Sequence, residues 1–235
     1  VTGVQTCALP IFLLGTDQLG RDIWSRLVLG TRVTLAVGLI AVIISLLLGG
    51  LLGMIAGYVG GRADKIILYI MNVTWSIPVL LLVFGITAAI GKGMLQIFVA
   101  VGCTMWVSVA RLVRSEVMLI RKMEYVQAAQ LLGIGHERIL RKHILPNLTG
   151  ILVVSAASNF ASAIMIEAGL SFLGLGVQSP VPGWGLMMRE NYTYLITGHA
   201  IAAIVPGLAM CSLVAAFYAL SNGLRNVFDL SQKIN

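Results

Sequence analysis

The sequence predicts an all-α membrane protein, a polytopic bundle with five membrane-spanning helices. Of its 235 residues, 58% are hydrophobic and only 11% are charged, whereas charged residues make up about 25% of a typical soluble domain. Its mean hydropathy is +0.96. So much apolar surface requires lipid as a solvent, and a backbone in lipid must form helices to satisfy its own hydrogen bonds. Five uncharged apolar segments are candidates for the spans: residues 33–58, 66–90, 94–110, 148–166 and 200–221.

The N-terminal residues divide into a doubtful leader and an external segment. Residues 1–12 have neither the basic start nor the long apolar core of a signal peptide. We treat them as a leader that need not be native and leave them out of the expected fold. Residues 13–32 are expected to form an external segment before the first span. Residues 33–235 are expected to form one transmembrane domain.

The first span carries a stripe of glycines at Gly49, Gly53 and Gly57. Their spacing of four residues places them on one helix face, where the missing side chains let another backbone approach closely. Ordinary helix packing is the interpretation that we favour. A lining for a transport path is the alternative.

Prolines and polar residues interrupt the later spans. Pro78 and Pro206 fall within apolar segments, where proline removes a helical hydrogen bond and usually kinks the helix. Either kink is a possible hinge, although most such prolines are structural. Asn159 is one of several polar residues at membrane depth, which are expected to face the bundle interior. The sequence leaves open whether Asn159 joins helices or lines a channel.

The distribution of basic residues predicts the orientation. Alternating the five segments puts Arg21, Arg26, Arg32, Lys92 and Arg189 on one side and the other Lys and Arg residues on the opposite side. The richer side is expected to be cytoplasmic, which places the C-terminus inside. This arrangement also fits one further helix upstream. Because the basic residues flank apolar spans and form no strip with aromatic residues, the net charge of +7 does not indicate nucleic-acid binding.

The longest polar stretch between spans, at about residues 111–147, is expected to be a cytoplasmic loop of two short helices. Its first part is rich in Ala, Leu and Gln, which favour helix. Gly133 and Gly135 break that helix, and Gly135 can cap a second one. The second helix is expected to end before Pro146, which then begins the next span.

Two small residues in this loop, Ala128 and Ala129, are expected to form a flat spot on the first short helix. A partner protein can approach closely at such a spot. The alternative is an amphipathic surface helix that lies on lipid headgroups without a partner. The residues alone do not separate these two interpretations.

A family resemblance favours the first of them. Gln127-Ala-Ala-x-x-x-Gly133, followed by His143-Ile-Leu-Pro146, resembles the cytoplasmic "EAA" loop of binding-protein-dependent ABC importers. In that family the loop is a coupling helix that docks on an ATPase subunit. Gln127 stands where Glu is usual, and Gly135 replaces a frequent Ser cap. The resemblance implies these docking residues: Glu124, Gln127, Ala128, Ala129, Gly133, His143 and Pro146.

Other segments extend the resemblance from about residue 14 to residue 229. The segment from Leu14 through Asp22 and the segment from Glu167 to Gly176 are similar to the second, "C-type" permease of the importers for dipeptides, oligopeptides and nickel. These permeases normally have six helices, so the first is expected to be missing here. The resemblance implies a type I ABC importer fold in the bacterial inner membrane. It also implies a second homologous permease, two ATPase subunits and an external substrate-binding protein as partners.

The sequence lacks the motifs of a self-sufficient enzyme or pump. No phosphate-binding loop is present: Gly91-Lys92 is followed by Gly93 where Ser or Thr is needed. No cofactor or metal is expected on this chain, because its three histidines are scattered; ATP and Mg²⁺ are expected on the partner ATPase. We therefore predict a peptide permease subunit, with nickel or another small solute as the alternative substrate. An ion-coupled secondary transporter would need mid-membrane acids and an internal repeat, and an inert anchor would not need the structured loop.

Overall fold

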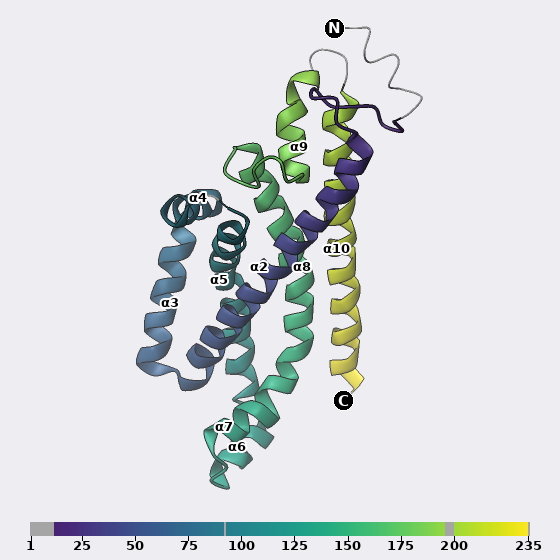
Figure 1. The fold of residues 1–235 in the computed structure, drawn as a ribbon. Helices are drawn as coiled ribbons and strands as arrows, with labels where there is room; N and C mark the ends of the chain where they lie inside the picture. The colour runs from purple at the N-terminus through teal and green to yellow at the C-terminus, as the bar shows by residue number, and fades with distance from the viewer. Residues whose placement is uncertain (1–11, 92, 196–199, 235) are drawn as a thin grey trace.

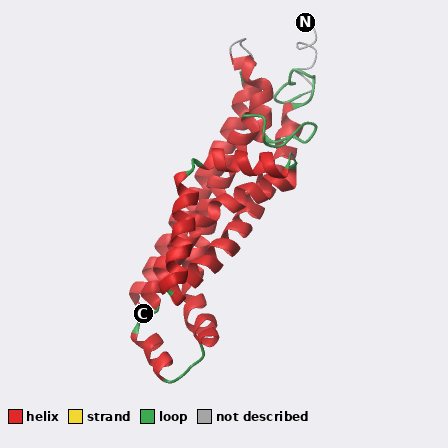
Figure 2. Cartoon of the chain, turned by 90° about the vertical axis from the view of Figure 1, so that its left-hand side faces the viewer, coloured by secondary structure: helices red, strands yellow, loops and turns green. Residues whose placement is uncertain are grey.

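A computed structural model of the chain describes residues 12–91, 93–195 and 200–234. Figure 1 shows these residues as an elongated bundle, and Figure 2 shows that they are almost wholly helical, with two short helical arms at the end near the C-terminus. Residues 1–11 of the doubtful leader lie outside the described residues. The α-helices are α2 (Ile23–Val59), α3 (Gly61–Ser76), α4 (Val79–Ile90), α5 (Met94–Ile120), α6 (Glu124–Leu131), α7 (His136–Ile139), α8 (Leu145–Phe172), α9 (Trp184–Asn191) and α10 (Ile201–Ile234).

Four continuous helical segments in the described residues are long and apolar enough to cross a membrane. They are α2, α5, the continuous helix His136–Phe172, and Ile201–Phe228 of α10. The pair α3 and α4 gives a fifth span if the two helices are counted together. The helical membrane bundle predicted from composition is therefore confirmed, with four or five spans.

Helix α2 begins at Ile23, ten residues before the expected first span. Asp22 caps it, because the Asp22 carboxylate accepts hydrogen bonds from the backbone N–H groups of Trp24 at 3.3 Å and Ser25 at 3.0 Å. The external segment expected at residues 13–32 is thus helical over its second half. Composition alone marks the apolar part of a helix and not its capped end.

The segment expected to form one kinked span, residues 66–90, is two helices at an angle of 96°. Ile77 and Pro78 between them are both extended, with ψ of 128° and 129°. The ring of Pro78 disfavours the helical conformation at Ile77, and Pro78 has no N–H to continue the helix. Pro78 therefore ends a helix instead of kinking one, whereas Pro206 lies inside the unbroken α10.

The polar loop is shorter than expected at its N-terminal side. Helix α5 continues to Ile120, so Arg111 and Arg114 lie on a helix and not in a loop beginning at residue 111. The guanidinium of Arg114 makes two contacts with the Asp64 carboxylate of α3, at 2.5 and 2.7 Å. The guanidinium of Arg111 lies 4.1 Å from the ring centroid of Trp75. These contacts give both charged side chains of α5 partners on α3.

The second short helix does not end before Pro146. Residues Leu140–Ile144 form a π-helical turn, η1, which joins α7 to α8, and the helix runs unbroken from His136 to Phe172. Pro146 occupies the first turn of α8. A proline ring clashes with the carbonyl four residues before it, and the wider π turn gives that ring room.

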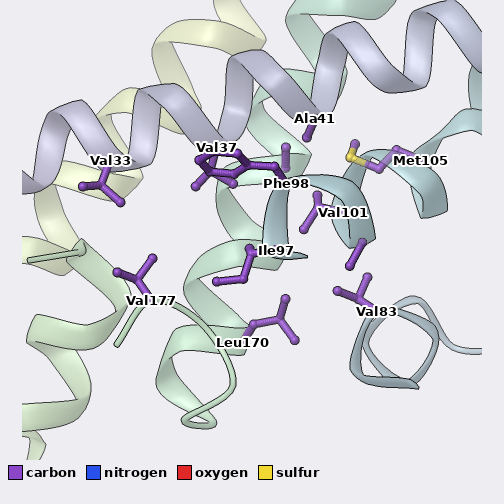
Figure 3. Close-up of a cluster of buried hydrophobic side chains, with 12 residues drawn as sticks. Val33, Val37, Ala41, Val83, Ile97, Phe98, Val101, Met105, Leu170 and Val177 are labelled. Carbon is purple, nitrogen blue, oxygen red and sulfur yellow. The ribbon is translucent and has the colours of Figure 1, made fainter. Parts of the chain in front are cut away.

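The core of the bundle lies where α2 crosses α5 and α8. Figure 3 shows one of its clusters, in which Val37 and Ala41 of α2 lie near Phe98 and Val101 of α5. Lipid is as apolar as these side chains, so close packing, more than escape from water, stabilises helix contacts in a membrane. The α2–α5 pair therefore depends on how near the two backbones can come.

Candidate functional site

The glycine stripe of α2 faces the backbone of α5. A Cβ atom built on Gly49, Gly53 or Gly57 would lie 2.5, 2.6 or 2.7 Å from a backbone carbonyl oxygen of α5. Real Cβ atoms are not found this close, so each glycine is required at its position. The three glycines lie in a helix contact and not on an open surface.

The loop between α5 and α8 is a helical hairpin that begins with α6. Helix α6 ends at a reversal in which Gly133 has φ of +73°, a conformation that suits glycine. The Ile134 N–H donates to the Ala129 carbonyl at 3.1 Å, and the Leu132 N–H donates to the Ala128 carbonyl at 3.0 Å. These bonds satisfy the carbonyls at the end of the helix and fix the direction of the returning chain.

The returning arm starts at Gly135, which precedes α7 and occupies its N-cap position. The Tyr58 hydroxyl at the end of α2 lies 2.8 Å from Nδ1 of His136, and the two rings meet edge to face with centroids 5.7 Å apart. The guanidinium of Arg121 lies over the Tyr58 ring, 5.9 Å from its centroid. The hairpin is therefore attached to α2 as well as to its own neighbours α5 and α8.

The hairpin has one buried face and one exposed face. Val126 and Ala129 of α6 and Ile139 of α7 are buried in a cluster with α5 and α8. The flat spot expected from Ala128 and Ala129 is therefore only half accessible, because Ala129 is 5% exposed while Ala128 is exposed. A helix turns by 100° per residue, so adjacent residues do not share a face.

The exposed face of the hairpin ends in two leucines that the sequence analysis did not single out. Leu131 is 90% exposed and Leu132 is 81% exposed. Exposed apolar side chains at a tip indicate a binding surface when they stand together. The sequence does indicate this position, because Leu131 and Leu132 follow Ala128 by three and four residues and so continue the helix face that Ala128 occupies.

The other predicted docking residues lie around this face. Glu124 and Gln127 are exposed on α6, and the Gln127 amide nitrogen donates to the Lys122 carbonyl at 3.1 Å. A carboxylate at position 127 has no proton to donate and cannot make this bond. The glutamine that replaces the usual glutamate thus contributes a bond to the start of its own helix.

Residues His143 and Pro146 lie on the returning arm and not on α6. Asn147 connects the two arms, because its Nδ2 donates to the Tyr125 hydroxyl at 3.1 Å and to the His143 carbonyl at 2.6 Å. The rings of Tyr125 and His143 are 5.9 Å apart. Pro146 is exposed beside them. The hairpin thus brings the predicted set together at one end of the bundle.

The three residues predicted for a path or hinge are not neighbours. Pro78 is exposed at the break between α3 and α4, and Pro206 is buried in α10. Asn159 lies in the middle of α8, 9% exposed, and lines a groove beside α5. Only Asn159 of the three adjoins a cavity that reaches the hairpin.

At the opposite end of the bundle, four charged residues form a partly buried network. Arg26, which is 7% exposed, contacts the carboxylates of Asp17 and Glu190, and Arg21 contacts the same two carboxylates at 2.7 Å each. Burial raises the pKa of Asp17, but hydrogen bonds from Arg21, Leu19 and Arg26 outweigh it and hold the pKa below its ordinary value. The network ties the segment before α2 to α9.

Glu167 directly follows the span expected at residues 148–166. Glu167 instead lies inside α8, which continues to Phe172, and it is 1% exposed. Its carboxylate accepts a hydrogen bond from the Ser171 hydroxyl at 2.6 Å. The Ser171 hydroxyl in turn accepts from the Val177 N–H at 3.1 Å. Glu167 therefore fixes the loop that follows α8.

The fold and the hairpin define a class: a multi-pass helical membrane protein with a helical hairpin at one end of the bundle. The chain belongs to the family described as binding-protein-dependent transport system inner membrane component, whose model matches residues 49–231. This membership places it among membrane permease subunits and not among ATPase subunits.

Individual relatives agree with this membership. The chain is 39% identical over 215 residues to the dipeptide transport system permease protein DppC of Bacillus subtilis, covering 92% of this chain and 67% of the relative. It is 40% identical over 218 residues to the di/tripeptide transport system permease protein DppC of Pseudomonas aeruginosa, covering 93% and 72%. It is 39% identical over 216 residues to the glutathione transport system permease protein GsiD of Pectobacterium atrosepticum, covering 92% and 71%.

Solved structures show the same fold at low sequence identity. An inward-facing structure of the MetNI methionine ABC transporter is similar with a TM-score of 0.70 and 20% identity, covering 86% of this chain and 95% of that chain. A structure of an amino acid ABC transporter with histidines is similar with a TM-score of 0.58 and 16% identity, covering 90% and 94%. The type I importer fold expected from the resemblance is confirmed.

Proposed function

We propose that this chain is the membrane-spanning subunit of an ATP-driven peptide importer and forms the path for peptides with a second, homologous permease. The observation that carries the proposal is the identity of 39–40% to permeases of dipeptide, di/tripeptide and glutathione systems over nearly the whole chain. The alternative, a nickel or other small-solute importer, is not favoured by these relatives. Neither is an ion-coupled secondary transporter.

The hairpin formed by α6 and α7 is the proposed docking site for the ATPase subunit. Its exposed face combines small, polar and apolar residues: Glu124, Gln127, Ala128, Gly133, Leu131 and Leu132. Its other face is held by α2, α5 and α8, so movement of the hairpin is passed to three helices at once. Two ATPase subunits bind ATP and Mg²⁺, an external binding protein delivers the peptide, and this chain binds neither nucleotide nor metal.

The proposed orientation follows from the charges. The end of the bundle that carries the hairpin also carries Arg121, Lys122, Arg138, Arg141 and Lys142, and basic residues favour the cytoplasmic side. This places the hairpin and the C-terminus in the cytoplasm of a bacterium, and the network of Asp17, Arg26 and Glu190 outside the inner membrane.

Reconstitution tests the proposal. The chain is combined in liposomes with a second permease, an ATPase and a binding protein of a peptide importer, and uptake of a dipeptide, a longer peptide and a nickel chelate is measured with and without ATP. We expect ATP-dependent uptake of peptide. Uptake of nickel alone, or uptake that needs no ATP, would contradict the proposal.

A further inference from the structure

A groove of about 1190 Å³ runs along the bundle between α5 and α8 and is flanked by the last turns of α10. Figure 1 shows α8 between α5 and α10. Tyr125 and Pro146 of the hairpin region stand at one end of the groove, and Ser158 and Asn159 stand at the other, in the middle of α8. The groove therefore leads from the hairpin end of the molecule to membrane depth.

The inner walls of the groove carry hydroxyl groups whose protons are already used. The hydroxyls of Ser108, Ser155 and Ser158 donate to carbonyls of their own helices, at 2.8, 2.7 and 3.0 Å. A hydroxyl oxygen that donates its one proton keeps lone pairs for accepting. The walls therefore offer hydrogen-bond acceptors to a molecule in the groove.

Asn159 at the inner end adds an amide. Its side chain is 9% exposed, and its Nδ2 has no hydrogen-bond partner among the described residues. A buried donor without a partner costs about 1–3 kcal/mol, so native structures seldom keep one without a reason. Asn159 lines the groove, so a molecule bound there is an available partner for this amide.

The charged residues that line the groove lie toward its mouth. Glu116 lies on α5 about two turns nearer the hairpin than Ser108. Arg225 lies on α10 about one turn nearer the C-terminus than Ser221. The Ser221 hydroxyl is 3.2 Å from the Ser158 hydroxyl. The inner part of the groove, as far as the structure describes it, is neutral, and its serine and asparagine side chains lie among apolar ones such as Ile151 and Val154. Such a surface is costly against lipid and suits a molecule that both donates and accepts hydrogen bonds.

We infer that this groove is the chain's own wall of the transport path and that it binds the peptide backbone. The inference rests on the proposed function and adds the chemistry of recognition. Backbone N–H groups donate to the serine oxygens, and a backbone carbonyl accepts from the Asn159 amide. Because every peptide bond offers the same donor and acceptor, such a wall accepts peptides regardless of their side chains. It gives a bare metal cation no set of charged ligands.

The test uses the whole importer in liposomes, with ATP hydrolysis and peptide uptake measured on the same samples. Asn159→Leu replaces the amide by an apolar side chain of the same branched shape and number of heavy atoms. We expect about tenfold less peptide carried per ATP hydrolysed, as for the loss of one hydrogen bond of about 1.4 kcal/mol. Asn159→Gln keeps an amide and should recover part of the uptake. Ser155→Ala, which removes an acceptor, should lower uptake in the same direction, whereas Ser115→Ala, an exposed position on α5 outside the groove, should not.

The outcomes separate this inference from the proposed function. An importer that carries peptide equally well with Asn159→Leu would overturn the inference alone. Equal losses with Asn159→Leu and Asn159→Gln would show that packing and not the amide matters, which also overturns it. If the unmodified importer carries no peptide, the proposed function fails, and the backbone-binding inference fails with it.

Discussion

Tyr58 and His136 join the last turn of α2 to the first turn of α7, with the Tyr58 hydroxyl 2.8 Å from the His136 Nδ1. Tyr58 is 8% exposed, and Gly57 beside it is pressed against α5. The hairpin is thus fastened to a helix that reaches the far end of the bundle. This contact is one route by which movement of the hairpin reaches α2.

Removing the hydroxyl tests the importance of this joint. Tyr58→Phe keeps the ring and deletes the hydrogen bond, so we expect the free energy of unfolding in detergent to fall by about 1 kcal/mol. In the assembled importer, we expect more ATP to be hydrolysed per peptide carried, because the hairpin moves α2 less effectively. Tyr69→Phe, at a position that is 70% exposed on α3, is the matched control. Equal coupling in the two variants would show that the joint is not used.

The glycine stripe predicts opposite effects for two neighbouring substitutions. Gly53→Ala places a methyl group 2.6 Å from the Ala110 carbonyl oxygen, and overpacking of this kind costs about 1–3 kcal/mol. Gly50→Ala meets nothing within 4 Å and should stabilise the helix by up to about 1 kcal/mol, since alanine is the better helix former. Thermal unfolding of the purified variants measures both. Equal shifts would contradict the close contact of α2 with α5.

The Asp17 network predicts a loss of stability in acid. The pKa of Asp17 is held below its ordinary value by its hydrogen bonds, so the stabilisation is fully present above pH 3.8, the unfolded value, and is lost as the pH falls through the lower folded value. Asp17→Asn should remove this pH dependence and lower the free energy of unfolding by about 3 kcal/mol at neutral pH, because it breaks a buried charge pair.

The control for Asp17→Asn is an exposed pair of the same kind. Glu137 lies 2.9 Å from Arg141, and its side chain is 78% exposed. Glu137→Gln should change the free energy of unfolding by less than about 1 kcal/mol. If both variants lose the same stability, the network at Asp17 is no more than a surface feature.

The two alanines of α6 give a sharp test of docking. In a chain freed of its own cysteines, a cysteine replacing Ala128 should crosslink to the ATPase subunit in an active complex, because Ala128 is exposed. A cysteine replacing Ala129 should not, because that side chain is 5% exposed against α5 and α8. Absence of any crosslink from position 128 would show that the hairpin does not dock there.

Much of this fold follows from simple patterns, and the exceptions have physical causes. Apolar length predicts the bundle and its spans, because lipid leaves the backbone little choice but helix. The same count treated Pro78 as a kink within one helix, since it cannot distinguish a proline that kinks a helix from one that ends it. It also missed that α5 continues past Arg111, because the contacts of Arg111 and Arg114 with α3 depend on residues far away in sequence.

The candidate site was predictable as a segment but not as a surface. The motif around Gln127 and Gly133 located the hairpin, and glycine at a positive φ supplied its turn. Which of Ala128 and Ala129 is accessible depends on the packing of α6 against α5 and α8. The network of Arg26 with Asp17 and Glu190 joins residues more than 160 positions apart, so no local pattern indicates it.

The central claim is that this chain supplies a passage and a docking surface, while ATP is hydrolysed on another polypeptide. The most direct measurement compares ATP hydrolysis and peptide uptake by the purified chain alone in liposomes with those of the complete importer. We predict neither activity from the chain alone and both from the complete assembly. Hydrolysis of ATP, or uptake of peptide, by the chain alone would contradict the claim.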